Sequence, residues 1–181
     1  MDSAQAPGTD TASVLTSDAR QYLTFVLADA EYGVDILRVQ EIKGWDTATA
    51  LPNTPEYVQG VMNLRGAIVP IIDLRQRFRM ERLDPGPTTA VVVLKVVHDH
   101  GSRIMGVVVD AVSDVHNVTD AELRPAPECG STASSECVQG LATVNGQMLI
   151  ILDIAGLLRL AQYRAGTSLG LQRPETVRQA A

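Results

Sequence analysis

VQGVMNLRGAIVPIIDLRQRF, residues 58–78, recurs as VQGLATVNGQMLIILDIAGLL at residues 138–158. The two stretches are 80 positions apart, and their apolar positions match along most of their length. Six aligned positions are identical, whereas ordinary residue frequencies give roughly one or two by chance. The identical pairs are Val58/Val138, Gln59/Gln139, Gly60/Gly140, Gly66/Gly146, Ile71/Ile151 and Asp73/Asp153. An internal repeat of this kind constrains the architecture before any single residue is given a role.

A weaker echo precedes the main repeat. YGVDILRVQEI at residues 32–42 aligns with MGVVVDAVSDV at residues 105–115, at an offset of 73. The larger offset of the main repeat implies seven extra residues in the second half, most simply in the polar loop PAPECGSTASSE. Two copies of one β unit, each of about 65–75 residues, suit a pair of small five- or six-stranded barrels. The matched residues of the echo are Gly33/Gly106, Val39/Val112 and Glu41/Asp114.

The repeat predicts how the chain is divided. Residues 1–18 are small and polar and are expected to be a disordered tail. We expect a first barrel over residues 19–86, a second barrel with a C-terminal helix over residues 87–160, and a flexible tail over residues 161–181. QYLTFVLA, EYGVDI and TTAVVVLKVV are strand candidates, whereas LRVQEI is ambiguous between a helical turn and a strand.

Composition limits the classes of protein. The 181 residues are 45% hydrophobic but only 4% aromatic, so Val, Ile and Leu must build the core, which favours sheets. A net charge of -6 disfavours non-specific binding to nucleic acid. No apolar run reaches the roughly 18–20 residues of a membrane span, and the first residues do not resemble a secretory signal. Cys129 and Cys137 are expected to be free thiols in a reducing cytoplasm, with a disulfide or a redox role as the alternative.

Turn and cap chemistry makes two local predictions. Asn145-Gly146 is a strong signal for a type I′ hairpin turn, which needs positive φ at both central residues. Its partner in the first copy is Arg65-Gly66. Asp73 and Asp153 each follow a β-rich run and precede a leucine-containing segment, so both are predicted to cap short helices.

Patterns of catalysis are scarce. GTSLG, residues 166–170, matches the G-x-S-x-G pattern, but it lies in the predicted tail and the last histidine is His116. His98 and His100 flank Asp99 in an apparent turn, and two ligands alone are a weak metal signal. Phosphate cradles of the P-loop or dinucleotide type are absent from the sequence. We therefore expect no enzyme activity, no cofactor and no metal site.

Arg65 and Glu41 are the polar residues with the clearest functional interpretation. Arg65 occupies the position of Asn145, and an Arg at positive φ costs on the order of 1 kcal/mol. This favours a guanidinium displayed for a partner's carboxylate, with a solvated Arg in another turn type as the alternative. Glu41 is one carboxylate within apolar VQEI, and an ordinary outward-facing strand residue is its alternative. For the repeat glycines, a role in turns or close packing is the alternative to a role in binding. For the apolar candidates Ile36, Val39, Val112 and Val115, a position in the core is the alternative to a position at an interface.

EYGVDILRVQEIKG, VQGVMNLRGAIVPIIDLRQRF, and GVVVDAVSDV with RPAPE closely resemble the CheW family of bacterial chemotaxis coupling proteins. The resemblance covers about residues 21–160 and is specific, because three long motifs occur in order. It implies an all-β fold of two SH3-like five-stranded β-barrels, together one CheW-like domain over residues 19–160. It also implies a non-enzymatic scaffold that links the cytoplasmic tips of methyl-accepting chemoreceptors to the histidine kinase CheA.

The resemblance also implies partners and a binding surface. The expected partners are the kinase's regulatory domain, the receptor tips and other CheW copies in arrays, with the protein in the cytoplasm at the inner face of the membrane. The positions matching the family's binding residues are Ile36, Val39, Glu41, Gly60, Arg65, Gly66, Gly106, Val112, Val115 and Gly140. Glu41 and Arg65 would form the polar rim of an apolar patch, a common arrangement at interfaces.

Two other classes of function compete with the scaffold. An enzyme that used Ser168 or the histidine pair would need a downstream base or a fuller ligand set. A nucleic-acid-binding barrel is compatible with the fold class. The negative charge and the few aromatic residues oppose recognition by stacking on bases.

Overall fold

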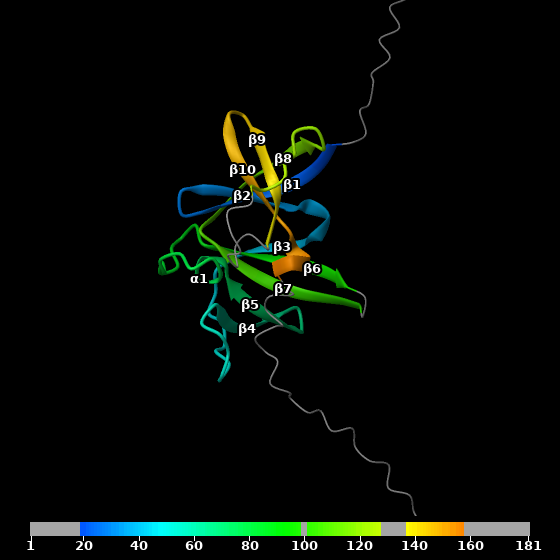
Figure 1. Ribbon diagram of the computed structural model, residues 1–181. Coiled ribbons are helices and arrows are strands. Elements are labelled where there is room, and N and C mark those ends of the chain that lie inside the picture. Colours follow the sequence, from blue (N-terminus) through cyan, green and yellow to red (C-terminus); the bar gives the residue numbers. More distant parts are fainter. Residues whose placement is uncertain (1–18, 99–100, 128–136, 158–181) are drawn as a thin grey trace, which may run out of the picture.

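The computed structural model describes residues 19–98, 101–127 and 137–157, and strands dominate this part of the chain (Figure 1). Turn pairs such as Asn145-Gly146 separate runs rich in Val and Ile, which is why the elements are short strands. The elements are β1 (Ala19–Leu27), β2 (Ala30–Asp35), the 3₁₀ helix η1 (Ile36–Arg38), β3 (Val39–Gly44), β4 (Val58–Leu64), β5 (Ala67–Asp73), α1 (Leu74–Arg77), β6 (Ala90–His98), β7 (Gly101–Val109), β8 (Ala111–Thr119), β9 (Val138–Val144) and β10 (Gln147–Leu152), followed by a helical turn at 154–157.

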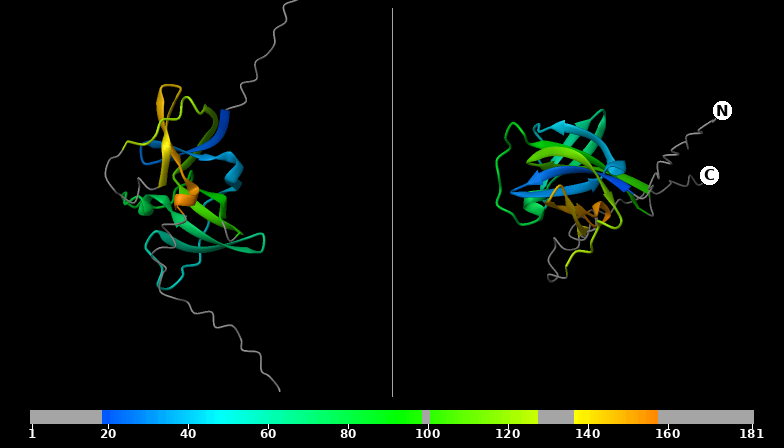
Figure 2. Two further views of the ribbon diagram at one scale, coloured as in Figure 1. Left: turned by 45° about the vertical axis from the view of Figure 1, so that its right-hand side comes forward. Right: turned by 90° about the horizontal axis from the view of Figure 1, so that it is seen from above.

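The strands form two five-stranded sheets. One has the order β8-β1-β2-β10-β9, and we call its strands unit A. The other has the order β3-β6-β7-β5-β4, and we call its strands unit B. The two units lie one above the other in Figure 1 and in the left view of Figure 2. The predicted all-β fold with two five-stranded SH3-like units is confirmed.

The two units are built in the same way. Each order contains one parallel pair in the same place, β2 with β10 in unit A and β7 with β5 in unit B. In unit A, Ile151 lies opposite Gly33, and in unit B its repeat partner Ile71 lies opposite Gly106. The same residues of the two sequence copies therefore occupy the same places in the two sheets.

The predicted division of the chain at residues 86 and 87 does not match the sheets. Unit B is continuous, from Val39 to Val109. Unit A combines the first hairpin, β1 and β2, with the last three strands, β8 to β10. The chain crosses from unit A to unit B at η1 and returns at Asp110. These connections are too short for the next strand to turn back and pair within the same sheet. Each unit thus joins a hairpin from one copy to three strands from the other.

The hydrophobic core has three parts. The largest cluster contains side chains of both units, including Phe25 and Val34 from unit A and Leu94 and Met105 from unit B. Smaller clusters lie within unit B and within unit A. Burial of apolar area stabilises such contacts by about 25 cal/mol per Å². The shared cluster therefore packs the two units against each other.

The turn and cap predictions are confirmed. Both hairpin turns have positive φ at both central residues, 52° and 89° at Arg65-Gly66 and 51° and 79° at Asn145-Gly146. An Asp73 Oδ1 accepts a hydrogen bond from the Gln76 N–H, and the Asp153 Oδ1 accepts one from the N–H of residue 155. The ambiguous LRVQEI contains both predicted states, a 3₁₀ turn followed by β3.

Several sequence features lie outside the described residues. These are both tails, GTSLG, residues 99 and 100 of the His-Asp-His turn, the helix expected beyond residue 157, and Cys129. Cys137 lies within the described part and is buried. Over the described ranges, no helix is both long enough and apolar enough to cross a membrane.

Candidate functional site: an ion pair at the edge of unit B

Glu41 and Arg65, which the sequence singled out separately, form an ion pair. The Arg65 Nη2 lies 2.9 Å from the Glu41 Oε2. The Arg65 side chain is 85% exposed, whereas that of Glu41 is 25% exposed. The Glu41 carboxylate is thus largely covered by the sheet, whereas most N–H donors of the Arg65 guanidinium face solvent.

Local backbone features bring the two side chains together. The register between β3 and β6 shifts between Val39 and Glu41, so Gln40 forms a β-bulge immediately before Glu41. Bulges commonly re-aim a neighbouring side chain. The β4–β5 turn places Arg65 at its tip, and Asn63 stabilises this turn by accepting a hydrogen bond of 2.8 Å from the Gly66 N–H.

The pair joins opposite edges of the sheet in unit B, since β3 and β4 are its outer strands. The segment between β3 and β4 also contacts β4: Thr49 and Val61 exchange two backbone hydrogen bonds of 2.8 and 2.9 Å in an isolated bridge. A cavity of about 170 Å³ lies beside the ion pair. Its lining combines the pair with mostly apolar side chains: Gln40, Leu64, Ala67, Val69, Val93 and Ile104. We call the pair and this lining the Glu41–Arg65 surface.

Unit A provides an internal comparison for this surface. Asp114 takes the place of Glu41 and is preceded by the equivalent bulge, because the register between β1 and β8 shifts at the matching position. Asn145 takes the place of Arg65. The Asp114 Oδ1 accepts a hydrogen bond from the Val115 N–H, its own neighbour in the strand. A cavity in unit A overlaps this region in part and contains Asp29, Glu31 and the exposed Met148, but neither Asp114 nor Asn145. The two units thus share the bulge and the hairpin turn and differ in the charged groups beside them.

Three glycines of the predicted site are buried. At Gly60, where φ is +133°, a Cβ would lie 2.1 Å from the Thr49 carbonyl oxygen. At its repeat partner Gly140, a Cβ would lie 2.6 Å from the Arg124 carbonyl oxygen. At Gly106, it would lie 2.6 Å from Ile71 Cδ1. These positions shape the strands that carry the surface, and only Gly66 among the predicted glycines lies in an open turn.

The apolar residues of the predicted site lie on η1, β3 and β8. Ile36, Val39 and Val112 are partly buried and pack against the core shared by the two units. Val115 is exposed on β8. Leu37, which the sequence reasoning did not select, is 84% exposed on η1 at the crossing between units.

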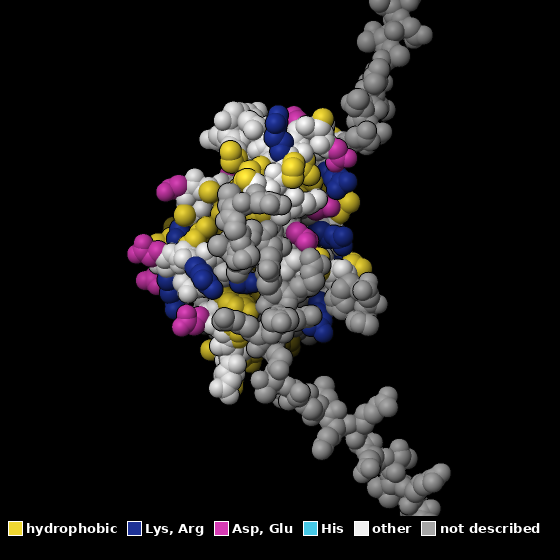
Figure 3. Space-filling view, viewed as in Figure 1, with side chains coloured by type: hydrophobic (Ala, Val, Ile, Leu, Met, Phe, Trp, Pro, Cys, Tyr) yellow, Lys and Arg dark blue, Asp and Glu magenta, His cyan; other side chains and the backbone are white. Residues whose placement is uncertain are grey.

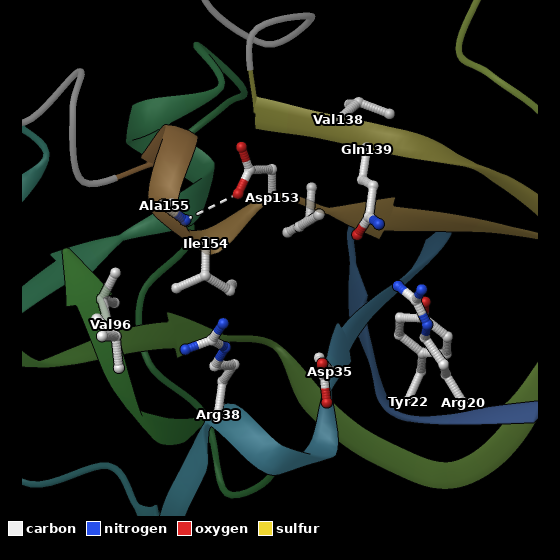
Figure 4. Close-up of a pocket in the computed structure, with 12 residues that line it drawn as sticks. Arg20, Tyr22, Asp35, Arg38, Val96, Val138, Gln139, Asp153, Ile154 and Ala155 are labelled. Carbon is white, nitrogen blue, oxygen red and sulfur yellow. Dashed lines mark hydrogen bonds between the residues drawn. The ribbon is translucent and has the colours of Figure 1, made fainter. Parts of the chain in front are cut away.

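A cavity of about 390 Å³ lies at the junction of the units and was not predicted (Figure 4). Arg20 and Tyr22 of β1, Arg38 of η1 and Val96 of β6 are among the residues that line it. In Figure 4 the Arg38 side chain extends toward Ile154. Burial raises the pKa of Tyr22, so its phenol is neutral at physiological pH. No motif marks Arg20 or Arg38 in the sequence, because only the crossing of the chain brings them together.

The described surface combines charged and apolar side chains. On the face drawn in Figure 3, acidic and basic side chains are interspersed, with hydrophobic side chains between them. The described residues contain no group of three or more His, Cys, Asp or Glu side chains arranged to hold a metal ion. An exposed guanidinium beside an apolar depression is suited to a partner that offers a carboxylate and an apolar side chain.

Comparisons with known proteins agree with this interpretation. The family model for the CheW-like domain matches residues 21–162. The chain is 47% identical over 139 residues to the chemotaxis protein CheW of Klebsiella aerogenes, covering 77% of this chain and 81% of that protein. It is 36% identical over 146 residues to the chemotaxis protein CheW of Rhizobium meliloti, covering 81% and 92%. The crystal structure of the scaffolding protein TtCheW from Thermoanaerobacter tengcongensis superposes with a TM-score of 0.68 at 29% identity, covering 75% and 85%.

The fold and the surface define an all-β module of the class to which chemotaxis scaffold proteins belong. The chain belongs to the CheW-like domain family.

Proposed function

We propose that this protein couples chemoreceptors to a histidine kinase by binding alone, without catalysis. The observation that carries the proposal is the Glu41–Arg65 ion pair beside an apolar depression in unit B. The partners proposed are the tips of methyl-accepting chemoreceptors and the regulatory domain of a CheA-type kinase. The protein would act in the cytoplasm, recruited to the inner face of the membrane through the receptors.

The shape of the molecule supports a bridging role. Units A and B each carry a depression, the two depressions share part of their lining by repeat position, and their charges differ. Partners with different charges therefore select different units, since mismatched charges at an interface are costly. Such a two-ended module holds two proteins at a fixed spacing, or joins further copies of itself in an array.

The ten residues expected from the sequence divide into three roles under this proposal. Glu41 and Arg65 contact a partner, and exposed Val115 contributes an apolar contact. Ile36, Val39 and Val112 pack against the core that the two units share and so help to hold the strands in place. The glycines act through backbone shape: Gly60, Gly66, Gly106 and Gly140.

Reversal of the charge at Arg65 tests the proposal. Arg65→Glu places two carboxylates together and removes the guanidinium, so binding to receptor fragments, kinase or both should weaken at least about 10-fold. Arg79→Glu is the matched control, because Arg79 is also an exposed arginine of unit B at positive φ (59°). Co-sedimentation of the ternary complex is the measurement.

Normal ternary assembly by Arg65→Glu would refute the assigned role. A Glu41→Arg/Arg65→Glu double variant separates two explanations for a loss of assembly. If the ion pair only stabilises the sheet, the reversed pair restores assembly. If a partner recognises the guanidinium at the turn, the loss persists.

A further inference from the structure

Asp110 links the two units at the second crossing of the chain, between β7 of unit B and β8 of unit A. Its carboxylate accepts two hydrogen bonds from Arg75 of α1, one of 2.7 Å from Nε to Oδ1 and one of 2.6 Å from Nη2 to Oδ2. The Ala28 N–H, in the β1–β2 turn of unit A, donates a third hydrogen bond of 2.8 Å to Oδ2. One carboxylate therefore binds groups from both units.

The groups around this carboxylate are held in place. The side chains of Arg75 and Asp110 are only 15% and 21% exposed. The Arg75 Nη1 also donates a hydrogen bond of 3.0 Å to the Glu81 carbonyl oxygen. The Asp110 N–H donates one of 3.1 Å to the Val26 carbonyl oxygen of β1. Bidentate pairs between arginine and a carboxylate have fixed geometry as well as strength.

Aromatic packing strengthens the same junction. Phe78, at the end of α1, stacks on Tyr32 of β2 with the ring centroids 5.8 Å apart. Tyr32 in turn stacks on Phe25 of β1 at 6.2 Å. The short helix α1 thus contacts the first hairpin of unit A in two ways: through Asp110, which Arg75 and the Ala28 N–H both bind, and through the stacking of Phe78 on Tyr32.

The repeat shows that, at the described positions, the second junction has different residues in the places of this ion pair. The other crossing is at η1. By the sequence repeat, Leu37 corresponds to Asp110 and is almost fully exposed. Ala155 corresponds to Arg75. Ala155 lines the junction cavity of about 390 Å³, and so does Val97 of the hairpin equivalent to β1–β2. Among the described residues, one junction is therefore bridged by an ion pair, and the equivalent junction, which we call the open side, contains this cavity.

We propose that Arg75 and Asp110 are positioning residues that fix the orientation of unit A relative to unit B. The bridged junction acts as the fixed side of the molecule, and movement between the units is confined to the open side. The consequence for binding rests on the proposed function: a partner that contacts both units needs this orientation, whereas a partner confined to the Glu41–Arg65 surface does not.

Residual dipolar couplings of backbone amides in the full chain test the orientation directly. In the wild-type protein, the couplings of unit A and unit B should fit one common alignment tensor. In Asp110→Asn and in Arg75→Met, each unit should still fit a tensor of its own, but the two tensors should differ in magnitude or direction. Arg75→Lys keeps one charged contact and should restore most of the common alignment.

A control variant tests whether a loss of stability away from the junction also separates the two alignment tensors. Val91→Ala removes buried apolar volume within unit B, where Val91 is 1% exposed, and does not touch the junction. It should lower the thermal midpoint and keep one common tensor. If Arg75→Met fails to fold, Asp110→Asn and Arg75→Lys still decide the question. A single common tensor in every folded variant would overturn the proposal and leave the pair a stabilising role only.

A binding measurement separates this inference from the proposed function. In Asp110→Asn, affinity for a fragment that needs only the Glu41–Arg65 surface should stay within about twofold. Assembly of the ternary complex should fall about 10-fold. If Arg65→Glu proves silent while the tensors still diverge in Asp110→Asn, the proposed function fails and the positioning role stands.

Discussion

Arg65 occupies a backbone position that an arginine does not favour. Its φ of 52° lies in the left-handed region, and the second copy of the repeat has Asn145 at the same place with φ of 51°. Asparagine tolerates this region because its short side chain hydrogen-bonds locally. The structure thus supports display of the guanidinium over the alternative of a different turn type.

Arg65→Asn should leave the stability of the protein nearly unchanged. Relief of the turn is worth on the order of 1 kcal/mol, and loss of a solvent-exposed ion pair costs about 0–1 kcal/mol. The free energy of unfolding should therefore change by less than about 1 kcal/mol in either direction, while partner binding falls. Urea titration and co-sedimentation provide the two measurements. A clear drop in the thermal midpoint would show instead that Arg65 is packed.

Gly60→Ala and Gly66→Ala should differ in severity although both residues have positive φ. A Cβ at Gly60 would lie 2.1 Å from the Thr49 carbonyl oxygen, whereas a Cβ at Gly66 would meet no atom within 4 Å. Gly66→Ala pays only for backbone strain, about 1 kcal/mol. Gly60→Ala must also displace the bridge between Thr49 and Val61, so a loss of at least about 2–3 kcal/mol is expected. Chemical denaturation of both variants compares them, and equal losses would contradict the steric explanation.

At the scale of elements, local chemistry was sufficient for prediction. The Asn-Gly pair predicted its turn, and Asp73 predicted the start of α1, because both depend on neighbours within a few residues. The ion pair between Glu41 and Arg65 was not predicted as a contact. It depends on the bulge at Gln40 and on the curvature that brings β3 toward β4, and neither has a signal in a single sequence.

Asp73→Ala should shorten or melt α1. Asp73 is buried and caps the helix through the Gln76 N–H, and it accepts a second hydrogen bond of 3.3 Å from Gln59 Nε2. Loss of a cap costs about 0.5–2 kcal/mol. Asp73→Asn keeps a capping oxygen and should recover most of the loss. Amide hydrogen exchange at Gln76 is the measurement, and unchanged protection in Asp73→Ala would exclude the capping role.

At the scale of the whole molecule, the repeat predicted two units but not which strands each unit contains. Sequence similarity identifies equivalent segments, and it carries no information on whether a hairpin pairs with its own copy or with the other one. The crossing at Asp110 decided this point, because one residue between β7 and β8 leaves no room for a return. Arg75 likewise looked like an ordinary residue of a repeat motif until the crossing placed it opposite that carboxylate.

The contribution of the Arg75–Asp110 pair to stability should depend on pH. Burial alone would raise the pKa of Asp110, but hydrogen bonds from Arg75 and from the Ala28 N–H, together with the charge of Arg75, outweigh it and hold the pKa below its usual range. The hydrogen bond to Asp110 raises the pKa of Arg75, so the guanidinium stays charged throughout. A folded-state pKa below the unfolded value means that the stabilisation is complete above the ordinary carboxyl pKa of about 3.9 and is lost as pH falls through the folded-state value.

Wild type and Asp110→Asn should therefore differ most near neutral pH. Hydrogen bonds to charged groups contribute about 1.5–3 kcal/mol, and we expect a difference of that order in the free energy of unfolding at pH 7. The difference should narrow as pH falls below about 4, because the unfolded chain then takes up a proton before the folded one, and it should be lost once the folded-state carboxyl is also protonated and resembles the neutral amide. Arg75→Met should converge on wild type over the same range, because protonation also removes the unpaired charge that this variant buries. Urea unfolding at pH 7, 4 and 3 measures all three curves. A difference that stays constant across these pH values would mean that Asp110 has the same pKa in the folded and unfolded states, so that neither Arg75 nor the Ala28 N–H stabilises its charged form.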